Sequence, residues 1–181
     1  MRIRGEKLKR MSEQTGIGVD ELSSGIERTG LSGKNAQSAV RNWMRGRDHP
    51  RCKAGDIVAL SQALGCEVRD IAKFTSKVSF HRGSDRKAKL VVDLIRGRQA
   101  DEALAMLSFA PQRAAVNVQK ALAAAVADAE LADADVGELV VSESTVDRAP
   151  PLKRFQPKDR GRAHAILKRQ SHITISVQER D

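Results

Sequence analysis

Residues 139–177 read LVVSESTVDRAPPLKRFQPKDRGRAHAILKRQSHITISV. The stretch begins and ends with β-type runs, 139–146 and 173–177, and in the second run apolar residues alternate with polar ones. Between them lies a polar segment with too few apolar residues to build a core of its own. We therefore expect a long hairpin at about 146–172, whose limbs of roughly ten residues would project on the order of 30 Å.

The hairpin segment is strongly basic. Residues 148–169 contain a single acid, Asp159, and eight cations: Arg148, Lys153, Arg154, Lys158, Arg160, Arg162, Lys168 and Arg169. Three prolines and a glycine should deny the limbs a regular ladder: Pro150, Pro151, Pro157 and Gly161. Because an isolated two-stranded arm is marginal in water, we expect a polyanion to order it through counterion release. A solvated basic loop is the alternative.

The charge pattern of the whole chain points to a polyanionic partner. The formal net charge is +9, and seven acids without any Lys or Arg precede the arm in residues 128–147. This reversal predicts a polyanion-binding surface at one end of the domain and a solvated opposite end. Nucleic acid is favoured over an anionic membrane surface. Four Phe, one Trp and no Tyr exclude base stacking as the main mode of recognition.

The residues before the arm predict three helices and a short strand. The strand is expected at Val78–His81, the first helix at Asp85–Arg96 with Ser84 as its cap and Gly97 after its end, and a short helix at Asp101–Leu107. Pro111 suits the first turn of a long helix whose buried stripe is Ala115, Val118, Leu122, Ala125, Val126 and Ala129. With the β runs, this predicts an α+β domain with a small antiparallel sheet at 77–181.

Three further cations occupy the first turns of the helix at 85–96. Arg86, Lys87 and Lys89 lie where the helix macrodipole favours acids. Contact with phosphates explains this placement, and ordinary surface cations are the alternative.

Several of these segments resemble the large-subunit ribosomal protein L22 family. They are SDRKAKLVVDLIRG at 84–97, then Lys153-Arg154, Pro157, GRA at 161–163 and KRQSHIT at 168–174. The resemblance implies binding to 23S-type rRNA, neighbouring ribosomal proteins, a role in subunit assembly and a hairpin that lines the peptide exit tunnel beside the nascent peptide. It places Lys153, Arg154, Lys158, Arg160 and Arg162 at the tunnel-lining tip, and Lys168, Arg169 and His172 in the rRNA-packed stem.

Three positions depart from the family pattern. Asp128 stands in place of the usual Asn, Ala149 in place of a common Gly before Pro, and Asp159 in place of a small residue. The acid at Asp159 should weaken phosphate contact locally.

Residues 1–75 predict a separate all-helical bundle of four or five short helices. ELSSGI at 21–26, VRNWMRGR at 40–47, Pro50 and IVALSQALG at 57–65 resemble the phage-repressor type of helix-turn-helix domain. Its second helix, Asn35–Arg45, would present residues that can address bases or phosphates: Gln37, Ser38, Arg41, Asn42 and Arg45. Trp43 is expected in the core. The segment 26–35 is longer than the usual turn, so a nucleic acid, a protein partner and a purely structural bundle all remain open.

An enzyme is not expected. The chain has no metal-binding His pair, its Gly30–Gly33 segment is too short for a phosphate loop, and the histidines are scattered. No catalytic residue, metal or cofactor is predicted. The two cysteines, Cys52 and Cys66, are expected to be reduced structural thiols.

The competing functional hypothesis is a free DNA-binding transcriptional regulator that uses the helix-turn-helix domain, with the basic arm as a nonspecific clamp. Because the chain shows neither a long apolar run nor a signal peptide, we expect a cytoplasmic protein without a membrane partner. The resemblance to the L22 family implies that this protein is ribosome-bound.

Overall fold

The computed structural model describes residues 1–26 and 28–180. The chain forms two compact units: the first contains Met1–Phe74 with Asp128–Ala134, and the second contains Thr75–Ala127 with Asp135–Arg180. Helices and an antiparallel sheet occur together, which confirms the predicted α+β class. In the described part of the chain, no helix combines the length and apolar character needed to cross a membrane.

The first unit is built from short helices. They are α1 (Gly5–Thr15), α2 (Val19–Ser24), α3 (Lys34–Met44), α4 (Ala54–Leu64) and α5 (Val68–Ile71). The two-residue strand β1 (Arg2–Ile3) pairs with the first residues of β2 (Ala72–His81). Gly65 ends α4 with a left-handed φ of 65°, a conformation that glycine adopts without steric cost.

The core of the first unit centres on Trp43. Its side chain is fully buried, as the sequence predicted, and its indole N–H donates a 2.6 Å hydrogen bond to the Pro50 carbonyl. A Cβ atom at Gly5 would lie 2.1 Å from the Trp43 carbonyl oxygen. The start of α1 therefore packs directly on the end of α3, and only glycine fits at that contact.

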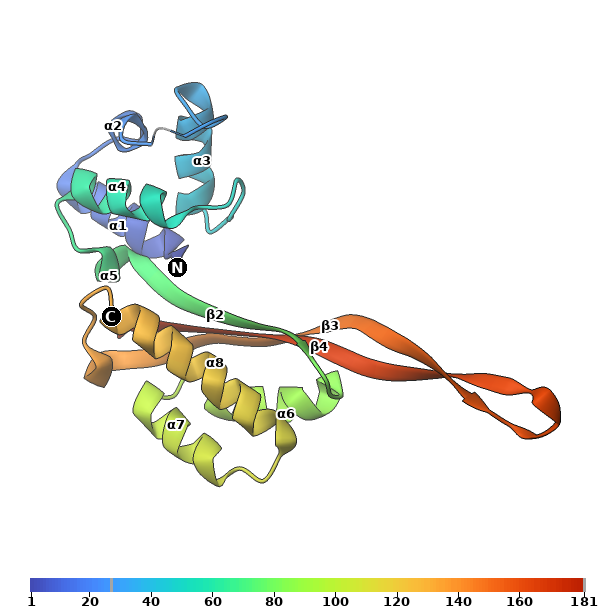
Figure 1. Cartoon of the computed structure of the whole chain (residues 1–181). Helices are drawn as coiled ribbons and strands as arrows, with labels where there is room; N and C mark the ends of the chain where they lie inside the picture. Colours follow the sequence, from blue (N-terminus) through green and yellow to red (C-terminus); the bar gives the residue numbers. More distant parts are fainter. Residues whose placement is uncertain (27, 181) are drawn as a thin grey trace. The chain divides into compact units, whose positions relative to one another are not determined.

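The second unit packs three helices on a sheet. The helices are α6 (Asp85–Ile95), α7 (Ala100–Phe109) and α8 (Arg113–Glu130), with short 3-10 turns η1 (Val136–Glu138) and η2 (Asp159–Gly161). The long strands are β3 (Leu139–Pro157) and β4 (Ala163–Glu179), and β4 lies between β2 and β3. Figure 1 shows β3 and β4 continuing past the helices as a two-stranded arm. Each residue of the predicted α8 stripe is buried.

The arm is more regular than the sequence predicted. Pairing stops after Ala149↔Gln170, resumes at Leu152↔Lys168 and continues to Pro157↔Ala163. The prediction that the prolines deny the limbs a regular ladder therefore holds at Pro150 and Pro151, where pairing is interrupted, and fails at Pro157, which pairs with Ala163. Pro150 and Pro151 fall within a single register shift, which places these two residues without an N–H group where no ladder bond is required.

Other element boundaries also differ from the predictions. β2 begins at Ala72 rather than Val78, because pairing with neighbouring strands extends it beyond its apolar run. Pro111 lies two residues before α8 instead of in its first turn. Ser84 occupies the N-cap position of α6 but makes no side-chain capping bond, so its predicted capping role is wrong. Gly97 has the expected left-handed φ, 76°.

Candidate nucleic-acid interface

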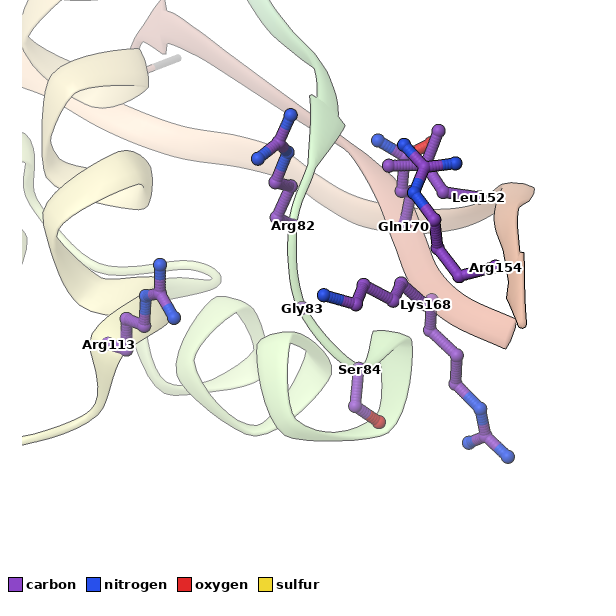
Figure 2. A pocket seen from close by; sticks show the side chains of 9 residues that line it. Arg82, Gly83, Ser84, Arg113, Leu152, Arg154, Lys168 and Gln170 are labelled. Carbon is purple, nitrogen blue, oxygen red and sulfur yellow. The ribbon is translucent and has the colours of Figure 1, made fainter. Parts of the chain in front are cut away.

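A basic hollow of about 400 Å³ lies at the base of the arm. Its walls come from the loop after β2, the start of α8, and both strands of the arm. Five lining residues are cations and none is an acid; the cations are Arg82, Arg113, Arg154, Lys168 and Arg169. Figure 2 shows the Lys168 side chain extending from β4 toward Gly83. This basic hollow concentrates positive charge where an anion can enter.

The end of β2 directs the chain into the basic hollow. Phe80 adopts a left-handed backbone with φ 56°, which costs on the order of 1 kcal/mol or more for a residue with a side chain. Its N–H donates to His172 Nδ1 at 3.2 Å, and the two rings meet edge-on with centroids 4.8 Å apart. These contacts hold the turn that carries Arg82 and Gly83 to the hollow.

His81 forms the inner wall of this turn. Its side chain is buried, and the Asn117 amide donates to His81 Nδ1 at 2.7 Å in the neutral tautomer that carries its proton on Nε2. Burial lowers the pKa of His81, and the nearby Arg113 guanidinium lowers it further. A Cβ atom at Gly83 would lie 2.6 Å from His81 Nε2, so only glycine lets the loop pass this close to the ring.

The first turns of α6 add exposed cations beside the basic hollow. Ser84 lines the hollow and precedes α6, so the positive end of the helix dipole opens there. The predicted residues Arg86, Lys87 and Lys89 are all exposed. A helix start without a side-chain cap and with exposed cations is suited to an anionic ligand.

The strand register gives the outer arm two different faces, because opposite residues share a face and neighbouring pairs alternate. One face carries Leu152, Arg154, Gln156, His164, Ile166 and Lys168. The other carries Lys153, Phe155, Pro157, Ala163, Ala165 and Leu167. The first face supplies Arg154 and Lys168 to the basic hollow, whereas the second exposes apolar side chains, Phe155 at 75% and Leu167 at 57%.

The remaining predicted arm residues lie in different environments. The exposed ones are Arg148, Lys153, Lys158, Arg160, Arg162 and Arg169. His172, expected in the stem, is half-buried, and its Nδ1 accepts the hydrogen bond from the Phe80 N–H. Among the departures from the family pattern, Ala149 is buried opposite Gln170, whereas Asp128 and Asp159 are exposed.

Sequence reasoning did not identify Arg82 and Arg113 as site residues. They are 31 positions apart and belong to different elements, so no local motif joins them. The cations in the first turns of α6 were the only local sequence signal near Arg82. Arg113, at the start of α8, joins Arg82 in the basic hollow only through the packing of α8 in the folded unit.

The first unit has a separate basic surface on α3. Ser38, Arg41 and Arg45 are exposed, whereas Gln37 and Asn42 are half-buried. The Asn42 amide donates a 3.0 Å hydrogen bond to the His49 carbonyl. A groove of about 380 Å³ is lined by Lys9 of α1, by Arg41 and Met44 of α3, and by Arg45, the C-cap residue of α3. We call this the α1–α3 groove.

The structure provides no metal or disulfide chemistry in the residues it describes. No group of three or more His, Cys, Asp or Glu side chains there could hold a metal ion. Cys52 and Cys66 are both free. Burial, followed by the charges of Asp56 and Asp48, raises the pKa of the Cys52 thiol to about 12, so this thiol stays protonated and unreactive.

Comparison with known families identifies the second unit. A family model described as ribosomal protein L22p/L17e matches residues 76–178, more than half of the chain. The chain belongs to the ribosomal protein L22p/L17e family. The resemblance stated from the sequence is thereby confirmed for this region.

Membership in the L22p/L17e family gives the chain a role as a structural protein of the large ribosomal subunit, not as an enzyme. The matched range contains the arm and every residue of the basic hollow. Residues 1–75 lie outside it. The match gives no support to a free DNA-binding regulator.

Proposed function

We propose that this chain binds 23S-type rRNA through the basic hollow, the first turns of α6 and the arm, and so supports assembly of the large subunit. The observation that carries the proposal is the convergence of five cations, with no acid, on one hollow. Phosphates would replace water and counterions there. The proposed contacts are Arg86, Lys87, Lys89, Arg148, Lys153, Arg154, Lys158, Arg160, Arg162, Lys168, Arg169 and His172, to which the geometry adds Arg82 and Arg113.

For the arm, the proposal is that its tip lines the peptide exit tunnel beside the nascent peptide. Lys153, Arg154, Lys158, Arg160 and Arg162 would belong to the tip. Lys168, Arg169 and His172 would contact rRNA in the stem. Neighbouring ribosomal proteins would contact the globular domain, and the protein would be ribosome-bound in the cytoplasm.

For the first unit, the proposal is a helix-turn-helix domain at 1–75, joined to the ribosomal domain at 77–181. The order and bounds of α2 and α3 support it, while the nine residues from Gly25 to Gly33 make the connection longer than the usual turn. Gln37, Ser38, Arg41, Asn42 and Arg45 are the candidate contacts. A nucleic acid or a protein is the expected kind of partner.

Co-sedimentation with purified large subunits tests the rRNA proposal. The protein should bind at near one copy per subunit and resist moderate salt. Replacing Arg82 and Lys168 by Gln should lower the slope of log affinity against log salt by about 2, since each phosphate contact contributes roughly 0.9.

The matched control removes the same charge away from the basic hollow. Lys77 and Lys120 are exposed and do not line it. Changing both to Gln should leave the salt slope nearly unaltered. Equal slopes for the two double variants, or a protein with no subunit-bound fraction, would contradict the proposal.

A further inference from the structure

We propose that the α1–α3 groove binds the phosphate backbone of a double-helical RNA segment, giving the chain a second RNA site outside the ribosomal domain. The groove joins Lys9 with Arg41 and Arg45 around the side chain of Met44. The assignment of RNA as the ligand rests on the proposed function of the second unit.

The charge on α3 is one-sided. Lys34, Ser38, Arg41 and Arg45 follow helical spacing, so they share one face, and all four are exposed. No acid occurs in Lys34–Met44. This face therefore presents cations and a hydroxyl, which are groups that contact phosphate oxygens.

The neighbouring acid on α1 does not neutralise the groove. Lys9 lies 3.8 Å from Glu13, and both side chains are more than 60% exposed. An ion pair of this length in water contributes little. Lys9 can thus turn from Glu13 to a phosphate at low cost.

The side-chain amides of Gln37 and Asn42 are not well placed to contact base edges. Asn42 is half-buried and donates to the His49 carbonyl, and Gln37 is half-buried. Specific readout in a DNA major groove relies on such amides and on paired arginine contacts. Contact with the backbone alone needs only the exposed cations, and it suits RNA duplexes, whose deep major groove does not admit a helix.

The second unit explains why RNA is the expected ligand of the α1–α3 groove. A ribosomal domain on the same chain raises the effective concentration of RNA around the first unit. Individually weak phosphate contacts are then sufficient for binding. A free protein domain without this tether would need tighter contacts.

The test uses the full chain and its single tryptophan. Trp43 lies on α3 beside Asn42 and Met44, so its one indole N–H signal reports on the first unit alone. Titration with a short RNA duplex should shift this signal in a salt-dependent way. Arg41→Gln with Arg45→Gln should lower the salt slope by about 2, whereas Arg10→Gln with Arg51→Gln, exposed residues outside the groove, should not.

Two further measurements distinguish the possible outcomes. Arg41→Lys with Arg45→Lys keeps the charge and should retain binding, and an unchanged indole position in each free variant shows that the fold is intact. An indole signal that RNA does not move, equal slopes for groove and control variants, or sequence-dependent preference for DNA duplex would overturn the proposal. Because subunit co-sedimentation is measured separately, failure here leaves the rRNA proposal standing.

Discussion

The hairpin of β3 and β4 has an inner and an outer half that share one backbone ladder but differ in burial. In the inner half, 139–149 paired with 170–179, Leu139, Ile173 and Ile175 are fully buried. In the outer half, 152–157 paired with 163–168, no residue is buried. Hydrogen-bonded pairing is thus common to both, and only the inner half also contributes to a core.

Polar groups reinforce the difference between the halves. Within the inner half, the buried Ser144 hydroxyl donates to the Val92 carbonyl at 3.0 Å, and Ser176 bonds Thr75 at 2.8 Å. The outer half instead carries exposed cations. The inner half should therefore fold with the domain, whereas the outer half should depend on a polyanion for its order.

The largest expected effect comes from one substitution made in each half. Leu139→Ala removes a fully buried side chain and should lower the free energy of unfolding by about 2–5 kcal/mol. Leu167→Ala, at a position 57% exposed, should change it by less than about 0.5 kcal/mol. Urea unfolding of both variants measures the contrast, and similar losses would mean that the outer half belongs to the core.

A smaller effect is expected from a polar group of the inner half. Ser144→Ala deletes the hydrogen bond to Val92 and should cost about 1 kcal/mol. Thermal unfolding beside His164→Ala, an exposed position of the outer half, provides the comparison. No loss in the Ser144 variant would show that this buried bond does not stabilise the inner half.

The smallest effect is a pH dependence that arises from His81 at the end of β2. Burial, and then Arg113, lower the pKa of folded His81 below its ordinary value of 6.5. As pH falls below 6.5, the unfolded chain takes up the proton first, so stability is full above this pH and declines below it. In urea midpoints from pH 8 to pH 5, His81→Gln should show a flatter decline than the unaltered protein. An identical pH dependence would exclude this role.

The sequence predicted the elements that carry a local signal. The stripe from Ala115 to Ala129 and the cations of residues 148–169 were recognised because helical spacing and charge runs are visible in one dimension. The same reasoning located the hairpin and the buried Trp43.

What depends on long-range packing could not be predicted. Arg82 and Arg113 meet only through the tertiary fold, and the early start of β2 follows from strand pairing. The hydrogen bond from the Asn42 amide to the His49 carbonyl depends on the path of the loop after α3. The continuation of the ladder beyond Pro150 and Pro151 could not be predicted either, because the register shift that accommodates them depends on the partner strand.

The most direct test of the account is amide hydrogen exchange, measured on the free protein and on the protein bound to large subunits. Amides of the inner half should exchange slowly in both states. Those of 152–157 and 163–168 should exchange rapidly in the free protein and become protected on the particle, because phosphates then surround the arm. Slow exchange across both halves in the free protein would contradict the claim that RNA orders the arm.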